Sequence, residues 1–390
     1  MALVHTYNKF GPVEDQSFPY YVWTYIPNYT LIEFIDKCHD RAVPLNIACL
    51  TEPAFNTPPH HPLNDGWEDT EVNIIYGSYG KYDYEKEYYK NSDVAERMQP
   101  NRHFFPMYFL YHTFGEYTHY YMYPTYVEYQ PDAYFTCYNR TCRPHRIILL
   151  QYLKEAGLLD YNYYSLVYND YEKEVYQESY KFDFSKANFE VKHPEGREEV
   201  DKNYYSHHKS YTSSAFQLVT ETTDDHIFLT EKTFYPILSR KPFIIFGAQH
   251  TNKVLKKFGF KLYTEVFDYS FDDIADTEVR AIAITKEIER VSKKYFPKEL
   301  YELMKETAEY NFRVAVNIVS KKKYIPKKFK EWDKLYQNNG IWTGHITMWY
   351  RMAFLHIDKY VEAIISYDEA ITEDSKESLG EQTEAETQPE

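Results

Sequence analysis

The stretch SSAFQLVTETTDDHIFLTEKTFYPILSRKPFIIFG, residues 213–247, decides the fold. Within it, AFQLVTET alternates apolar and polar residues and predicts a strand, EKTFYPILSR predicts a short helix, and KPFIIFG predicts a buried strand. A strand, a helix and a second strand in this order are typical of a parallel βαβ unit. The sequence therefore predicts an α/β fold built around this segment.

More elements of the same kind lie on both sides of this segment. A helix is predicted from about Pro144 to Gly157, because glycine suits the end of a helix. The other predicted elements are strands at DAYFTCYN (132–139) and YSLVYND (164–170), a short helix at TNKVLKKFGF (251–260), consecutive helices over 272–320 and a final helix over 341–366. This alternation extends the parallel α/β pattern through the second half of the chain.

The first half shows a weaker α/β pattern. Leu31 to Ile35 carry a helix pattern, PLNIACLTEP (44–53) predicts a short buried strand and EVNIIYGSYG (71–80) predicts another. RHFFPMYFLYH (102–112) is a compact aromatic segment, and residues 116–134 are expected to form an aromatic-rich linker and loop. The chain is therefore expected to have an N-terminal α/β domain over 1–130 and a second α/β domain with closing helices over 131–366.

The charge of the chain is concentrated at one end. The formal net charge is −15, and nine acidic residues against Lys376 place −8 of it in residues 367–390. This segment is poor in apolar residues, so we expect a disordered acidic tail. The overall negative charge and the pI near 5.5 argue against a dedicated nucleic-acid binder, which usually carries a basic face. The remaining −7 still allows a local cationic pocket for a diphosphate.

Composition and missing motifs exclude several other classes. The mean hydropathy is −0.66, and no stretch approaches the roughly 18 apolar residues of a membrane span. The first residues lack the pattern of a secretory signal, and four cysteines are too few for a disulfide scaffold, so a cytoplasmic protein is expected. Glycine-rich dinucleotide and Walker motifs are absent. No metal site is expected, because Cys137, Cys142 and His145 have no second pair at suitable spacing.

The start of the predicted helix at 231–240 offers chemistry for a nucleotide. Thr230 is a plausible helix cap, and a helix start with Lys232 beside it is a good binding site for a diphosphate. Glu231 could accept hydrogen bonds from ribose hydroxyls, and the preceding strand delivers Glu221 to a sheet edge. The alternative is an ordinary helix cap with a surface Glu–Lys pair, since such starts are common.

This segment resembles the donor site of the alpha-1,3-fucosyltransferases and related phage and bacterial glycosyltransferases. The resemblance is carried by Phe216, Glu221, LTEKTF (229–234) followed by Pro236-Ile237, PFIIFG (242–247) and FDYSFDDI (267–274). It implies two Rossmann-like domains that face a cleft, the GT-B arrangement. It also implies that Glu221, Thr230, Glu231 and Lys232 bind the donor.

Two further segments extend the resemblance. The family's Asn followed by an Arg that opens a helix is matched by Asn139 and Arg146, with Arg143 as a competing candidate one turn earlier. An arginine there could bridge phosphates, because its planar fork suits their oxygens. In the first half, the family's catalytic glutamate corresponds to Glu52, although Thr51 stands where the family has glycine.

The acceptor side of this resemblance rests on fewer residues. The family's aromatic segment is matched by RHFFPMY (102–108), which makes Tyr108 a candidate acceptor contact. His60 and His61 lie in a loop near Glu52 and are further candidates; a pair of ordinary loop residues is the alternative. The donor side is therefore the better defined part of the predicted site.

The resemblance implies an inverting glycosyltransferase that needs no metal ion and no bound cofactor. Glu52 would take the proton of the acceptor hydroxyl, while Arg146, Lys232 and the helix start would stabilise the leaving diphosphate. The donor would be a GDP- or UDP-sugar. The acceptor would be a glycan or another hydroxyl compound, in the cytoplasm, or in the host cytoplasm for a viral protein.

Two other functions remain open from the sequence. The chain could be a non-catalytic relative, a carbohydrate-binding or virion-associated structural protein that keeps the fold. It could also act on DNA that carries modified bases, with the lysine-rich run at 321–330 as the contact. A solvated turn between helices is the alternative for that run. The sequence does not predict the oligomeric state.

Overall fold

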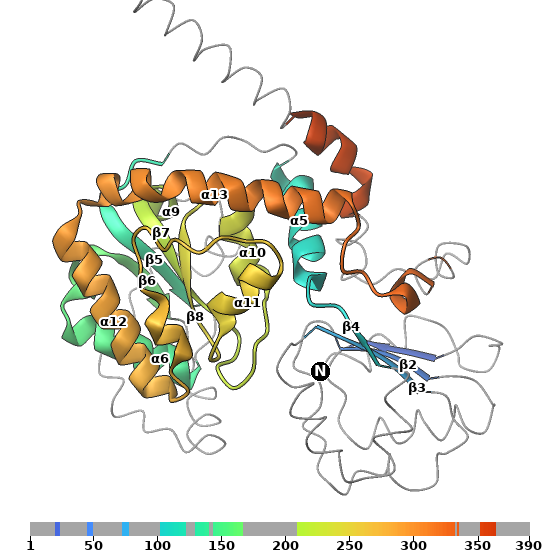
Figure 1. Ribbon diagram of the computed structural model, residues 1–390, viewed down its shortest axis with the longest axis horizontal. Helices are drawn as coiled ribbons and strands as arrows, with labels where there is room; N and C mark the ends of the chain where they lie inside the picture. Colours follow the sequence, from blue (N-terminus) through green and yellow to red (C-terminus); the bar gives the residue numbers. More distant parts are fainter. Residues whose placement is uncertain are drawn as a thin grey trace, which may run out of the picture.

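The computed structural model describes part of the chain. The described residues are 20–23, 45–49, 72–77, 102–121, 129–139, 143–166, 209–331, 334 and 352–363. The predicted helix around Leu31 and the acidic tail lie outside them. The described part has an α/β fold with parallel sheets and packed helices (Figure 1).

One parallel sheet belongs to the second half of the chain. Its strands run parallel in the order β6-β5-β7-β8. Their bounds are Ala133–Asn139 for β5, Tyr163–Leu166 for β6, Ser214–Thr220 for β7 and Phe243–Phe246 for β8. These strands confirm the parallel α/β pattern predicted around residues 213–247.

Strand β7 differs in one respect from its alternating sequence. Alternation is typical of a strand with one exposed face, yet every residue of β7 is buried, including Gln217 and Thr220. The reason is its position, since β7 pairs with β5 on one side and β8 on the other and helices cover the sheet. The polar residues of β7 therefore lie in the interior.

The helices of the second half form two groups around this sheet. α6 and α12 pack together on one side, and α10 packs on the other with α13 and with α5, Tyr108–Tyr121, which comes from the first half (Figure 1). The bounds are Pro144–Glu155 for α6, Glu231–Leu238 for α10, Thr251–Lys257 for α11, Thr277–Lys294 for α12 and Pro297–Ser320 for α13. Gly157, just after α6, has a φ of +70°, a conformation that favours glycine and confirms the predicted end of that helix.

Helix α5 corrects the prediction for residues 116–134. The expected linker begins inside this helix, which spans Tyr108–Tyr121. Leu110, Tyr111 and Phe114 recur at helical spacing and are buried, so an apolar stripe drives the helix. That stripe was hidden by the many surrounding tyrosines. α5 packs on α10 and α13, although it precedes the domain boundary predicted near residue 130.

A second parallel sheet belongs to the first half, with the order β1-β2-β3-β4. Its strands are β1 Tyr20–Trp23, β2 Leu45–Cys49, β3 Val72–Tyr76 and β4 Arg102–Phe104. β2 and β3 confirm the two short strands predicted there. The chain runs from β4 into α5 with a short turn between them (Figure 1).

The end of the described chain contains two shorter helical segments. The lysine-rich run begins as an exposed turn after α13 and continues into a helix over 327–331, as the solvated-turn alternative predicts. Residues 352–355 and 357–363 are helical, inside the predicted final helix. None of the helices in the described ranges has the length and apolar character needed to cross a membrane.

Tyrosine hydroxyls satisfy carbonyl groups at the ends of three helices. Tyr111 donates to the carbonyl oxygens of Ile318 and Lys323, at the end of α13 and just beyond it. Tyr129 donates to Ser239, the residue that ends α10, and Tyr134 donates to a carbonyl in the last turn of α12. The last carbonyls of a helix lack partners within the helix, so these hydroxyls stabilise helix ends.

Lys241, which precedes β8, is fully buried among tyrosines. Its Nζ donates to the carbonyl oxygens of Tyr211, at 2.6 Å, and Ser214, and it lies 4.4 Å from the ring centre of Tyr129. No carboxylate pairs with it among the described residues. Burial therefore holds the pKa of Lys241 well below its ordinary value.

This lysine makes a testable contribution to the pH dependence of stability. Between the lowered pKa of Lys241 in the folded chain and the pKa of an unfolded lysine, near 10.4, the unfolded chain binds more protons at this site than the folded chain, so stability rises with pH. We expect the free energy of unfolding to increase from pH 7 to pH 9 more steeply in the wild type than in Lys241→Met. Urea denaturation at several pH values measures this, with Lys305→Met, an exposed lysine, as the control. Parallel pH profiles for wild type and Lys241→Met would contradict it.

Candidate functional site

The strand order of the β6-β5-β7-β8 sheet reverses between β5 and β7, because β6 lies outside β5 while β7 and β8 lie on its other side. In open parallel sheets, ligands bind at the carboxyl ends of the strands that flank such a reversal. These ends are Asn139 and Thr220, both buried. Thr220 Oγ1 donates a hydrogen bond to Oδ1 of Asn139, which joins the two strand ends.

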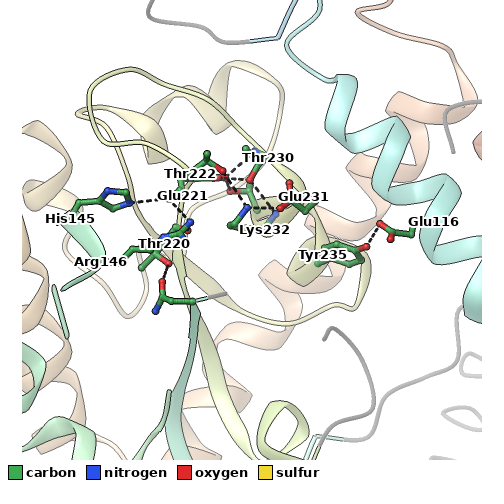
Figure 2. A network of polar contacts seen from close by, with 12 residues as sticks. Glu116, His145, Arg146, Thr220, Glu221, Thr222, Thr230, Glu231, Lys232 and Tyr235 are labelled. Atoms are coloured by element: carbon green, nitrogen blue, oxygen red, sulfur yellow. Dashed lines mark hydrogen bonds and ion pairs between the residues drawn. The ribbon is translucent and has the colours of Figure 1, made fainter. Parts of the chain in front are cut away.

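Two basic side chains from the first turn of α6 contact the end of β7 (Figure 2). The carbonyl oxygen of Glu221 accepts a hydrogen bond from Nη2 of Arg146 at 3.0 Å and lies 3.0 Å from Nε2 of His145. Because a carbonyl oxygen cannot donate, Nε2 of His145 carries the proton in this contact. Arg146 also donates to the carbonyl oxygen of Thr220 at 3.3 Å. α6 therefore holds the end of β7 in place.

Asp224, in the loop after β7, contacts the other ring nitrogen of His145, Nδ1. Its Oδ1 lies 3.3 Å from Nδ1 of His145, and its Oδ2 accepts a hydrogen bond from Oγ1 of Thr277 at 2.6 Å. Burial alone would raise the pKa of Asp224, but His145 and Thr277 together hold it well below its ordinary value. The ionised carboxylate thus ties the loop to both α6 and α12.

The carboxylate of Glu221 is buried and accepts four hydrogen bonds. Oε1 accepts from the backbone N–H of Thr230 at 3.1 Å and from Oγ1 of Thr233 at 2.5 Å. Oε2 accepts from Oγ1 of Thr230 at 2.5 Å and from the backbone N–H of Thr222 at 3.2 Å. These bonds use the acceptor capacity of a carboxylate, so Glu221 fixes the loop and the start of α10.

Gly247 lies against Glu221 at the end of β8. A Cβ atom at Gly247 would lie 3.3 Å from Cβ of Glu221 and 3.3 Å from Oγ1 of Thr251, which is tighter than ordinary contacts. The glycine therefore permits the close approach of β8 to the buried carboxylate. This is a packing reason for the glycine that ends the PFIIFG motif.

Glu231 and Lys232 form an ion pair with each other at the start of α10 (Figure 2). Nζ of Lys232 also donates to Oγ1 of Thr222 at 3.2 Å, and Thr230 caps the helix by accepting from the backbone N–H of Lys232. Burial would raise the pKa of Glu231, but Lys232, with a smaller contribution from His112, holds it below its ordinary value. A phosphate at this helix start would compete with Glu231 for Lys232.

Helix α5 adds a further carboxylate, that of Glu116, next to α10. Tyr235 lies one turn after Glu231, and its hydroxyl donates a hydrogen bond to Oε2 of Glu116 (Figure 2). Burial raises the pKa of Glu116 and the hydrogen bond from Tyr235 lowers it, while the charge of Glu231 raises it, with a net increase. The pKa of Glu116 is therefore raised, whereas the pKa of Glu231 is lowered.

The structure brings most of the predicted donor residues together and separates others. Asn139, Arg146, Glu221, Thr230, Glu231 and Lys232 cluster at the carboxyl ends of β5 and β7 and at the helices that follow them. Arg143 precedes α6 and is more exposed than Arg146. Tyr108 is buried, with its ring against Phe105 and Phe109, and lies in the core. Glu52, His60 and His61 lie outside the described residues.

Sequence reasoning missed three residues of this site as functional candidates. The sequence analysis considers His145 for metal binding alone, assigns no role to Asp224 and places Glu116 in the expected linker. For His145 the available signal was its place beside Arg146 in the first turn of a predicted helix. For Glu116 the signal was the helical spacing of the buried residues on α5.

Neither a metal site nor a known relative identifies the cluster. Within the described ranges, no group of three or more His, Cys, Asp or Glu residues is arranged to hold a metal ion. Comparisons with models of protein families, with curated proteins and with solved structures yield no match for the chain.

Replacement of Glu221 tests its role at the start of α10. Glu221→Ala leaves four donors without their acceptor, so we expect it to lower the free energy of unfolding by about 3 kcal/mol. Chemical denaturation measures this. Glu302→Ala removes an exposed ion pair with Lys305 and is the control, with an expected loss of about 0.5 kcal/mol or less. Equal losses in the two variants would contradict the structural role of Glu221.

Proposed function

We propose that the chain is a glycosyltransferase that moves a sugar from a nucleotide-diphosphate donor to a hydroxyl acceptor, with inversion and without a metal ion. The observation that carries this proposal is the convergence of two helix starts on one point of the sheet. α6 follows β5 and α10 follows β7, so both begin at the carboxyl ends of the two strands that flank the order reversal. A helix start favours negative charge, which suits a diphosphate.

The side chains at these helix starts support a role in holding phosphate. Arg143 and Lys232 lie at the starts of α6 and α10 and supply positive charge, and a leaving diphosphate gains negative charge as the sugar departs. Arg146 is buried against the backbone of β7, so we assign it to positioning the strand end and Arg143 to phosphate contact. Glu231 would then exchange its contact with Lys232 for ribose hydroxyls.

The finer features of this proposal come from the resemblance to the fucosyltransferases. They are a GT-B arrangement of two domains, a GDP- or UDP-sugar as donor, a glycan or other hydroxyl compound as acceptor, and Glu52 as the base. The β1–β4 sheet supports an α/β character for the first half, where the acceptor would bind. The alternative is a non-catalytic protein with the same fold.

Nucleotide binding tests the proposal. A ligand that binds the folded chain alone stabilises it, by about 2.7 kcal/mol at 100 times its dissociation constant. We expect GDP or UDP to raise the melting temperature of the wild type in a thermal-shift assay. In Lys232→Ala the shift should be much smaller at the same nucleotide concentration, because a phosphate ligand is lost.

Lys305→Ala is the matched control for this experiment. Lys305, like Lys232, pairs with a nearby glutamate, but it lies on the exposed side of α13, away from the strand ends. Its variant should keep the full shift. A chain that neither GDP nor UDP stabilises would contradict the proposal and favour the non-catalytic alternative, while equal shifts in all three proteins would reject Lys232 as a phosphate contact.

A further inference from the structure

We propose that Glu116 of α5, rather than Glu52, is the carboxylate that takes the proton from the acceptor hydroxyl, an inference that rests on the proposed sugar transfer. Glu116 precedes the β6-β5-β7-β8 sheet in the chain, yet α5 packs directly on α10, whose first turn holds the candidate donor residues. It therefore brings a carboxylate from the first half of the chain to the donor side.

The contacts of Glu116 differ from those of the other site carboxylates. Glu221 accepts four hydrogen bonds, Asp224 contacts His145 and Thr277, and Glu231 pairs with Lys232. Glu116 accepts one bond, at Oε2 from Tyr235, and within the described ranges no cation pairs with it. A partly buried carboxylate without a cationic partner is costly to ionise, and such groups concentrate at functional sites.

The two glutamates that flank this part of α10 have different protonation behaviour. Lys232 keeps the pKa of Glu231 low, so Glu231 stays ionised, whereas burial and the charge of Glu231 raise the pKa of Glu116. Paired groups whose pKa values are pushed apart are typical of sites where one group handles protons and the other supplies a fixed charge. A raised pKa also makes Glu116 a better proton acceptor.

The reaction step balances with Glu116 as the base. The ionised carboxylate takes the proton of the acceptor hydroxyl, and the acceptor oxygen forms a bond to the anomeric carbon of the donor sugar. The bond between that carbon and the diphosphate oxygen breaks, and its electron pair leaves with the diphosphate. Lys232 and Arg143, at the starts of α10 and α6, offset the charge that develops there, and Glu116 ends the step protonated.

The surroundings of Glu116 set the expected pH behaviour. Tyr235 and Glu231 of α10 are the described titratable groups that act on its pKa, and His112 lies one turn earlier on α5, where it acts on Glu231. Glu116 must be ionised to accept a proton, so activity should fall as the pH drops through its raised pKa. The hydrogen bond from Tyr235 opposes that rise.

Glu116→Gln is the first test. Glutamine keeps the size of the side chain and an oxygen that can accept the bond from Tyr235, so the fold should survive. We measure release of GDP or UDP from a panel of GDP- and UDP-sugars, with water as the acceptor. We expect about a 10²–10⁴-fold loss of rate, the usual contribution of a general base, with the nucleotide-induced thermal shift unchanged. Glu289→Gln, an exposed glutamate of α12, is the matched control and should keep the rate.

Tyr235→Phe separates proton transfer from a structural role. The variant removes the hydrogen bond that lowers the pKa of Glu116, so the acid side of the pH–rate profile should move to higher pH. A bond that merely holds α5 against α10 would lower the rate equally at every pH.

Each result supports or overturns the inference. A wild-type rate in Glu116→Gln, an unmoved acid limb in Tyr235→Phe, or a larger loss in Glu52→Gln than in Glu116→Gln overturns it. If the wild type binds GDP or UDP but releases no nucleotide from any donor, the assignment of Glu116 fails while nucleotide binding stands. If neither nucleotide binds, the proposed function fails first.

Discussion

The hydrogen bonds to the buried carboxylate of Glu221 are the interaction on which the rest of the site depends. A single side chain at the end of β7 accepts from the backbone and hydroxyl of Thr230 and from the hydroxyl of Thr233, across a loop. Burying a carboxylate is favourable when its acceptor sites are filled in this way. The loop is thereby closed, and the eight-residue α10, too short to be stable alone, begins at a defined residue.

Other charged and polar side chains surround this carboxylate at increasing distance from it. His145 and Arg146 hold the backbone of the same residue from α6, so the end of β7 is fixed through both its carbonyl group and its side chain. Lys232 and Glu231 lie farther along, at the start of α10, and Glu116 approaches from α5. The buried carboxylate of Glu221 has its acceptor sites filled by the protein, while the groups nearer the surface have partners that a substrate could replace.

The sequence was sufficient to predict the β6-β5-β7-β8 sheet and much of the donor cluster, because strong apolar runs and a capped helix start are local signals. Asn139, Thr230 and Lys232 were placed correctly relative to strands and helices. It could not predict that internal hydrogen bonds fill the acceptor sites of the Glu221 carboxylate. The donors of these bonds, Thr230 and Thr233, lie nine and twelve residues farther along the chain. Glu116 was missed because its importance depends on the packing of α5 against α10, which no local pattern encodes.

The tyrosine hydroxyls at the helix ends have a consequence for how the chain folds. Many helices end on a nearby glycine, and this chain has 12 glycines against 43 tyrosines. Here the caps of α13, α10 and α12 come from residues 207, 110 and 158 positions away in the sequence. Such helices acquire their final ends when distant parts of the chain meet, so secondary structure and tertiary assembly are completed together. Contacts of this separation slow folding, because the loop between them must close first.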